Sequence, residues 1–180
     1  MKKIEFKELS YDDIEDVRNW RNSVHVSRYM YTDNYISKTD QINWFNRINN
    51  CLYSKYWIII FNKEKIGLIN ITKINLDNKS CYWAFYIGVE KYREIGASVI
   101  AEFLFLDKLF FELEFEIIFC EVLINNTTVI SLHKKFGFKI INNEKFYIKK
   151  NNINQEYCRL VLQKNEFILI RDKLKQIILK

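Results

Sequence analysis

Proline is absent from this chain of 180 residues, and glycine, cysteine and histidine are scarce. The four cysteines, Cys51, Cys81, Cys120 and Cys158, are spread along the chain without a CxxC pair. Zinc sites place their ligands at short spacings, so this pattern, with only two histidines, argues against a metal centre. We therefore expect no bound metal and free, mostly buried thiols.

Long apolar runs are also missing. The longest, such as 57–61, are far shorter than the roughly 20 residues that a membrane-spanning helix needs. Residues 1–5 carry charges where a signal peptide has an apolar stretch. We therefore expect a cytoplasmic protein with no membrane segment. The chain has the length of one domain, and we expect that domain to span residues 1–180.

The composition indicates a globular protein that binds an anion. Hydrophobic residues make up 49% of the chain, enough for a substantial core, and this excludes general disorder. The formal net charge of +6 suits an anionic small molecule and also suits nucleic acid. No run of five or more basic residues occurs, so nucleic-acid binding is the weaker interpretation.

Apolar periodicity and turn signals predict a mixed α/β chain. Strands are expected at 4–9, 56–62, 66–74, 80–89, 116–124, 138–141, 145–150 and 155–162. Helices are expected at 11–22, 40–50, 94–111, 127–136 and 166–179, with Ser10 capping the first and Ser37 or Thr39 the second. Meander strands followed by β-α-β crossovers predict an α/β (α+β) fold with one mixed central sheet.

The segment Arg93-Glu94-Ile95-Gly96-Ala97-Ser98 lies between a predicted strand and the longest predicted helix. Glycine at such a joint lets backbone N–H groups at a helix N-terminus approach a phosphate closely, and the helix dipole favours the anion. The segment is neither a Walker loop nor GxGxxG. A single glycine before a helix is more often a plain turn, so this segment alone does not decide the function.

A second segment, 126–138, reads Asn-Thr-Thr-Val-Ile-Ser-Leu-His-Lys-Lys-Phe-Gly-Phe. It resembles the GNAT acetyltransferase signature of Asn, two spacers, Ala-Ile, a spacer, Leu-Tyr, Glu-Lys, a spacer and Gly-Phe. The first segment is similar to that family's pyrophosphate motif, R/Q-x-x-G-x-G/A, with Ser98 at the last small position. The resemblance implies the GNAT fold: a mostly antiparallel sheet with helices on both faces, in which strands 80–89 and 116–124 splay apart.

The same resemblance implies acetyl-CoA as co-substrate and no metal. Main-chain groups of the splayed strand would pair with the pantetheine arm, loop N–H groups would hold the pyrophosphate, and Asn126 would bond the pantetheine amide. The implied acetyl-CoA-binding residues are Tyr86, Ile87, Gly88, Val89, Arg93, Glu94, Ile95, Gly96, Ala97, Ser98, Asn126 and Lys135.

His133 stands where the family usually has the tyrosine that protonates the leaving thiolate. Imidazole titrates nearer neutrality than phenol, so histidine suits this general-acid role. Many family members place a base at the position of Tyr82, which serves poorly, and Glu121 is the candidate base, acting through water. A neutral incoming amine needs no base. A surface histidine and a solvent-facing glutamate are the structural alternatives for His133 and Glu121.

Softer similarities over nearly the whole chain point to the bacterial subfamily that acetylates the 4-amino group of a UDP-linked 4-amino-4,6-dideoxy sugar in pseudaminic acid synthesis. They include Trp20-Arg21-Asn22, Tyr29-Met30-Tyr31 and 71–75. The resemblance implies that Arg21 and Lys73 offset the phosphates. Aromatic stacking on the base and apolar contacts with the 6-methyl group would complete the site. The implied substrate residues are Arg21, Met30, Tyr31, Gln41, Trp44, Thr72, Lys73 and Tyr82, with Gln41 where the subfamily often has histidine.

Other interpretations stay open. Met30, Tyr31 and Trp44 also suit an ordinary core. A protein N-terminal or ribosomal-protein acetyltransferase of the same fold would share the second motif, although basic Arg21 and Lys73 favour an anionic acceptor. A GNAT domain that binds acetyl-CoA without catalysis is a further alternative. The terminal helix carries an apolar stripe that docks either on its own domain or on a second copy, giving a homodimer.

Overall fold

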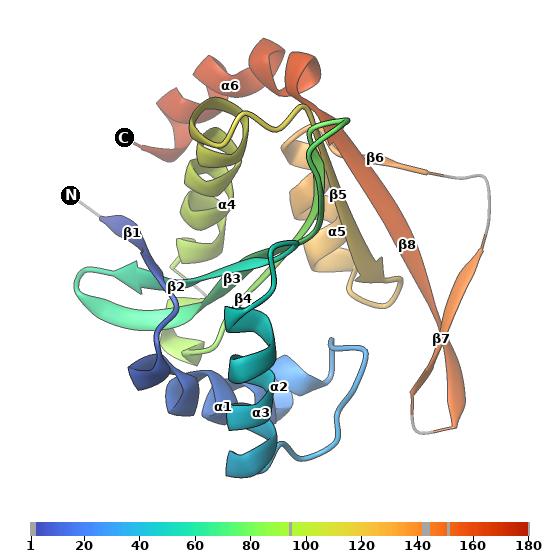
Figure 1. Ribbon diagram of the computed structural model, residues 1–180. Coiled ribbons are helices and arrows are strands. Elements are labelled where there is room, and N and C mark those ends of the chain that lie inside the picture. The colour runs from blue at the N-terminus through green and yellow to red at the C-terminus, as the bar shows by residue number, and fades with distance from the viewer. Residues whose placement is uncertain (1–2, 94, 142–144, 151, 180) are drawn as a thin grey trace. The chain divides into compact units, whose positions relative to one another are not determined.

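The computed structural model describes residues 3–93, 95–141, 145–150 and 152–179 (Figure 1). Its contacts form two compact units, and the chain enters each of them twice. Met1–Ile74 with Ala84–Ser98 make up the first unit, and Asn75–Trp83 with Val99–Lys180 make up the second. Strand β4, Ser80–Ile87, contributes its beginning to the second unit and its end to the first.

The first unit contains three strands before β4: β1 (Ile4–Glu8), β2 (Lys55–Phe61) and β3 (Glu64–Asn75). They are hydrogen-bonded in the order β1-β2-β3-β4, and the pairs β1–β2 and β2–β3 are antiparallel. Asn62 and Lys63 join β2 to β3 with φ angles of 47° and 72°. Positive φ at both positions matches the twist of a two-residue hairpin. The strands predicted at 56–62 and 66–74 are confirmed, and they form this hairpin.

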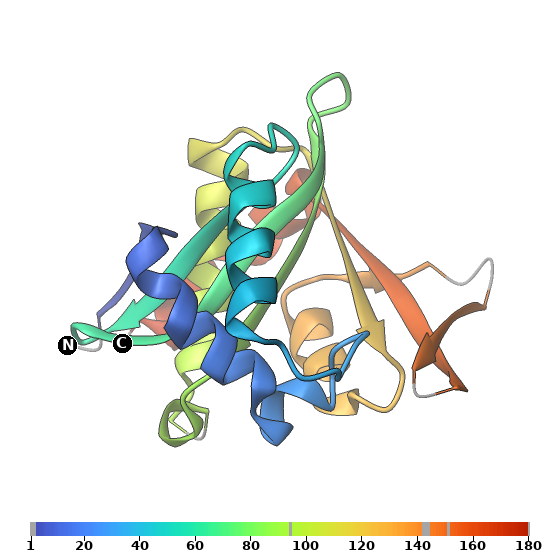
Figure 2. The same ribbon diagram turned by 60° about the horizontal axis from the view of Figure 1, so that its bottom comes forward.

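Helices of the first unit pack on these strands. They are a 3₁₀ turn (Tyr11–Asp13), α1 (Ile14–Asn22), α2 (Val24–Ser27) and α3 (Lys38–Asn49). Figure 2 shows α1 and α3 side by side. Val17 of α1 forms a buried cluster with Ile58 of β2 and Leu68 of β3. Ser37 caps α3, because its Oγ accepts a hydrogen bond from the Asp40 backbone N–H at 3.1 Å.

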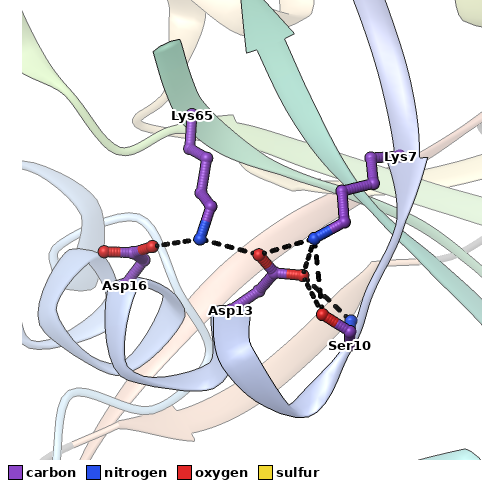
Figure 3. Close-up of polar contacts among 5 residues, drawn as sticks. All are labelled: Lys7, Ser10, Asp13, Asp16 and Lys65. Carbon is purple, nitrogen blue, oxygen red and sulfur yellow. Dashed lines mark hydrogen bonds and ion pairs between the residues drawn. The ribbon is translucent and has the colours of Figure 1, made fainter. Parts of the chain in front are cut away.

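The first helical segment starts at a buried carboxylate. Asp13 is fully buried, and its Oδ2 accepts hydrogen bonds from the Ser10 hydroxyl at 2.7 Å and the Ser10 backbone N–H at 3.0 Å. Lys7 and Lys65 approach the same carboxylate at 3.0 and 2.8 Å (Figure 3). This capping box ties the helix start to β1 and β3, and it confirms Ser10 as the cap.

The second unit is built on the beginning of β4 and four further strands: β5 (Ile117–Leu123), β6 (Lys139–Ile140), β7 (Phe146–Lys150) and β8 (Ile153–Gln163). β4 pairs with β5 in parallel, and the register joins Ser80 to Ile117 and Tyr82 to Phe119. β8 pairs antiparallel with β5, β6 and β7. The predicted mixed, mostly antiparallel sheet is confirmed. The splaying of β4 from β5 stays a prediction.

The helices of the second unit are α4 (Ala97–Asp107), a π-helical turn (Lys108–Glu112), α5 (Thr127–Lys135) and α6 (Lys164–Ile178). The first two residues of α4 belong to the first unit. Figure 1 shows α6 next to the end of α4 that leads into the π-helical turn. Phe167 of α6 is fully buried, with ring centroids 6.2 Å from Phe103 and 5.3 Å from Phe110. Arg171 donates to Asp107 Oδ2 at 3.1 Å. α6 therefore buries part of its apolar stripe within its own unit.

The observed elements follow the expected order. Each expected strand and helix is present, with ends shifted by a few residues. α2 is an addition, and the helix expected from Glu94 begins at Ala97 and ends in a π turn. Three of the four cysteines are buried, and all four are free thiols. Within the described ranges, the helices are too short or too polar to cross a bilayer.

Candidate active site

The predicted phosphate loop lies in the first unit, between the end of β4 and the start of α4. Gly96 has a φ angle of +79°, a left-handed conformation that favours glycine, and a Cβ built there meets nothing within 4 Å. α4 begins at the next residue, so the backbone N–H groups of its first turn have no partner within the helix. This geometry suits an anion. Glu94 lies outside the described residues.

The entry to the loop is held by α1 and α2. A Cβ built on Gly88 would lie 2.2 Å from Trp20 Cγ, so only glycine fits against this indole. His25 Nε2 donates to the Gly88 carbonyl oxygen at 2.9 Å, and Arg93 Nη1 contacts the His25 carbonyl oxygen at 3.4 Å. Gly88 N also donates to Ile66 O at 2.7 Å. The loop is thus anchored to α1, α2 and β3. His25 was not among the predicted site residues.

Several buried polar groups of the first unit lack partners among the described residues: Arg21 Nη1, Gln41 Nε2 and Tyr86 Oη. Burial lowers the pKa of the Arg21 guanidinium, and the nearby Tyr86 phenol opposes this shift. Burial also raises the pKa of Tyr86. Gln41 is only 3% exposed. An unmade hydrogen bond of this kind costs about 1–3 kcal/mol per group, so three orphaned groups in one unit point to a ligand.

The remaining predicted substrate-binding residues differ in how far their side chains are exposed to solvent. Trp44 packs at the edge of the cluster of Val17, Ile58 and Leu68, with its ring 5.3 Å from Tyr56 in an edge-to-face arrangement. Trp44 therefore has the core role that the sequence left open. Met30 and Thr72 are half-buried, and Tyr31 and Lys73 are exposed. Tyr82 belongs to the second unit.

His133 of α5 is buried in the second unit, where its Nδ1 lies 2.6 Å from Glu102 Oε1 on α4. Its ring packs 5.4 Å from Trp83 and 5.2 Å from Phe138. Glu102 is fully enclosed; burial raises its pKa, and His133 opposes the rise. The surface position considered for His133 is thus not observed. The sequence analysis did not identify Glu102 as a site residue. The pattern that could have identified it is a single carboxylate within the otherwise apolar segment 99–106.

Glu121 of β5 lies directly opposite Arg159 of β8 in the antiparallel register. Arg159 Nη2 and Nε donate to Glu121 Oε1 at 3.1 and 3.3 Å. The guanidinium also lies 4.4 Å from the centre of the Phe146 ring, and Tyr82 stacks on Phe119 at 5.2 Å. Glu121 is half-buried in an ion pair rather than facing solvent alone.

Two of the predicted acetyl-CoA-binding residues, Asn126 and Lys135, lie at the two ends of α5. Asn126 stands at its N-terminus and accepts a hydrogen bond from the Ile130 N–H on its carbonyl oxygen at 3.2 Å. The Asn126 side chain is half-buried and makes no capping hydrogen bond to the helix. Its amide is therefore not committed to the helix end, as a ligand-binding role requires. Lys135 is exposed in the last turn.

The sequence is similar to those of known acetyltransferases. The model of the "Acetyltransferase (GNAT) domain" family matches residues 3–139. Two curated proteins named acetyltransferase PseH are similar in sequence, both from Campylobacter jejuni. The serotype O:2 protein is 23% identical over 86% of this chain and 94% of its own length. The serotype O:23/36 protein is 25% identical over 79% of this chain and 87% of its own length.

The fold also matches a solved structure of spermidine N-acetyltransferase from Vibrio cholerae in complex with CoA and spermine. The TM-score is 0.84 at 18% identity, over 92% of this chain and 98% of that chain. At 18% identity, this similarity shows that the two proteins share a fold. The family model covers most of the chain, including both motifs that the sequence singled out. The chain therefore belongs to the GNAT family of acetyltransferases.

Proposed function

We propose that this enzyme transfers the acetyl group of acetyl-CoA to the 4-amino group of a UDP-linked 4-amino-4,6-dideoxy sugar, in the pseudaminic acid pathway. The proposal draws on the subfamily similarities of the sequence and on the two relatives named PseH, which align over most of their length. The proposed reaction requires an acceptor site that binds the anionic diphosphate of the UDP-sugar. The second class of candidate, an acetyltransferase of protein N-termini, needs an open groove for a peptide.

The observation that carries the proposal is the partly enclosed guanidinium of Arg21, a half-buried residue. Its Nη1 is buried without a hydrogen-bond partner among the described residues, and its titratable neighbour is the phenol of Tyr86, which burial keeps neutral near neutral pH. A buried cation without a counter-ion is costly, and the cost is offset when an anion binds. The orphaned Gln41 amide adds a donor, so the first unit offers hydrogen-bond donors to an acceptor. A nucleoside diphosphate supplies the matching acceptors.

The same observation argues against a polyamine acceptor. The Vibrio cholerae neighbour is named for spermidine, a polycation. A polycation is bound by carboxylates, whereas a buried arginine repels it. No ion pair to Arg21 occurs in the part of the chain that the structure describes. We therefore expect spermidine to be a poor substrate.

The residues of the loop fit acetyl-CoA. The backbone N–H groups around Gly96 and at the start of α4 would hold the pyrophosphate, and the glycine allows close approach. Main-chain groups from Tyr86 to Val89 that are not already bonded to Ile66 or His25 would pair with the pantetheine arm, and the Asn126 amide would bond one of its amides. Acetyl-CoA supplies the activated acetyl group, and these residues hold it in place for direct transfer in a ternary complex.

In the proposed reaction, the sugar amine attacks the thioester carbonyl carbon. The C–N bond forms, the C–S bond breaks, and the sulfur leaves with the electron pair of that bond. His133 donates a proton to this sulfur, and the amine loses one as the amide forms. Glu121 is already paired with Arg159, so we propose that it orders water for this proton and that the amine arrives largely neutral.

A direct assay tests the proposal. The purified enzyme is incubated with acetyl-CoA and the UDP-linked amino sugar, and free thiol and product mass are followed. We expect thiol release with one added acetyl group. Arg21→Met should raise KM for the UDP-sugar at least about tenfold, because a charged hydrogen-bonding partner is lost. Arg47→Met removes the same charge from an exposed position of α3 and should leave KM unchanged.

The same assay separates the alternatives. Equal turnover of spermidine, or an Arg21→Met variant with unchanged KM, would exclude the anionic acceptor site. Turnover of a peptide N-terminus without turnover of the sugar would favour the protein acetyltransferase. Tight binding of acetyl-CoA without any transfer would indicate a non-catalytic domain.

A further inference from the structure

Glu102 is a buried carboxylate whose position is not explained by packing. It lies on the apolar part of α4, is 0% exposed, and its neighbours Ala101 and Phe103 are buried side chains. Its Oε1 contacts His133 Nδ1 at 2.6 Å, whereas its Oε2 has no hydrogen-bond partner among the described residues. A carboxylate in such a place is unfavourable for folding, so it is retained for a reason other than stability.

The surroundings make the Glu102–His133 contact specific. The imidazole packs against the rings of Trp83 and Phe138, which stack on each other, and this packing restricts its rotation and keeps Nδ1 directed at the carboxylate. The titratable groups nearest the pair on the neighbouring strands are Cys120 of β5 and Cys158 of β8, and burial raises the pKa of both thiols. The other charged groups that act on these thiols are Glu121, on Cys120, and Lys134 and Glu156, on Cys158. Glu102 Oε1 contacts the imidazole directly.

A carboxylate beside one ring nitrogen determines the chemistry of the other. An ionised Glu102 can only accept, so Nδ1 then donates the hydrogen of the short contact, and in the neutral ring Nε2 is the unprotonated nitrogen. The negative charge also favours the doubly protonated imidazolium. Burial raises the pKa of Glu102, and the interaction with His133 opposes that rise.

We propose that Glu102 is the positioning residue of His133: it fixes Nδ1 as the donor to the carboxylate and reserves Nε2 for proton exchange with the leaving sulfur. This inference rests on the general-acid role of His133 in the proposed function. The Nε2–H bond breaks as the S–H bond of the released thiol forms, and Glu102 stabilises the imidazolium before transfer. The ring is then neutral with its hydrogen on Nδ1. The proton lost by the amine, carried by water, restores it.

The first experiment observes His133 without any acceptor substrate. The chain has only two histidines, so ¹⁵N NMR of the imidazole rings gives two sets of signals, and His25→Asn assigns them. We expect the neutral form of His133 to carry its hydrogen on Nδ1, unlike most histidines in water. A His133 ring protonated mainly on Nε2 would overturn the proposal. This readout uses the wild-type chain, so a variant that fails to fold does not remove it.

Glu102→Gln is the matched variant. The glutamine carbonyl still accepts from Nδ1, but the charge is gone. The titration midpoint of His133 should move to lower pH by about one unit or more, with that of His25 unchanged. An unchanged His133 midpoint would contradict the proposal.

Kinetics give the functional arm. A general acid works only while protonated, so kcat falls as pH rises past the His133 midpoint. In Glu102→Gln this alkaline limb should move to lower pH by the same amount as the NMR midpoint, with KM for acetyl-CoA nearly unchanged. A uniformly lower kcat with an unmoved limb would indicate a merely structural role. Failure of the wild type to acetylate the sugar would refute the proposed function, while the NMR result would still decide the Glu102–His133 pair.

Discussion

Asp13 is a buried residue whose charge is compensated within the first unit. Lys7, Lys65 and Ser10 surround its carboxylate (Figure 3). Burial tends to raise its pKa, but hydrogen bonds from these groups outweigh burial and hold the pKa well below its usual range. This is the opposite balance from Glu102, which has one partner and an orphaned oxygen, and whose pKa is raised. The contrast separates a carboxylate that stabilises the fold from one that we assign to function.

Asp13→Asn should destabilise the first unit by about 2 kcal/mol near neutral pH, because charge-assisted hydrogen bonds are lost. The folded-state pKa of Asp13 is depressed, so its stabilising contribution is present above the unfolded value of 3.8 and is lost as pH falls through the lower folded value. Urea unfolding of both proteins at neutral pH and below pH 4 measures this. We expect the difference between them to shrink in acid.

Asp16→Asn serves as the control. Asp16 is 45% exposed and contacts Lys65 alone among the ion pairs described, so its loss should change stability by no more than about 0.5 kcal/mol. Equal effects of the Asp13 and Asp16 variants would show that burial of the carboxylate is not what matters.

At the scale of elements, the critical contact joins α1 to the turn between β4 and the phosphate loop. Gly88 lies against the Trp20 indole, and its carbonyl oxygen accepts from His25 of α2. Gly88→Ala should therefore cost about 1–3 kcal/mol, since the added methyl group forces the indole to move. Binding of acetyl-CoA should weaken as well, because the loop loses its anchor. Urea unfolding and calorimetric titration of acetyl-CoA measure the two effects.

Gly96→Ala distinguishes steric from conformational effects in the same loop. The added Cβ meets nothing within 4 Å, so only the left-handed φ angle is unfavourable, at about 1–2 kcal/mol. If Gly96→Ala destabilised the chain more than Gly88→Ala, the packing of Trp20 against Gly88 would not be the controlling contact.

At the scale of the whole molecule, the net charge of +6 should attract anionic substrates over long distances. Raising the ionic strength from about 0.01 M to about 0.1 M shortens the Debye length from about 30 to about 10 Å. Affinity for acetyl-CoA should fall by about tenfold over this range. Titration with S-acetyl-pantetheine, which lacks the phosphates, is the control and should be nearly insensitive to salt. Equal salt dependence of the two ligands would refute electrostatic attraction.

The sequence predicted most of the fold because its signals are local. The strand at 4–9, the cap at Ser10 and the helix at 127–136 each depend on signals within a few residues, and all three are present with ends shifted by at most a residue or two. α2 was missed because four residues are too few for a periodic pattern. The π turn after α4 was missed because the sequence of 108–112 carries no signal that distinguishes a π turn from a continuing α-helix.

By itself, the sequence determined the order of elements, the family and the two motifs, since hydrophobic periodicity, caps and motif spacing are written along the chain. Only the tertiary structure decided which polar groups meet in the interior. Glu102 and His133 are 31 residues apart, and Glu121 and Arg159 are 38 apart, so no local pattern links them. Their pairing depends on how α4, α5, β5 and β8 pack, and packing determines which charges lose water and must find a partner.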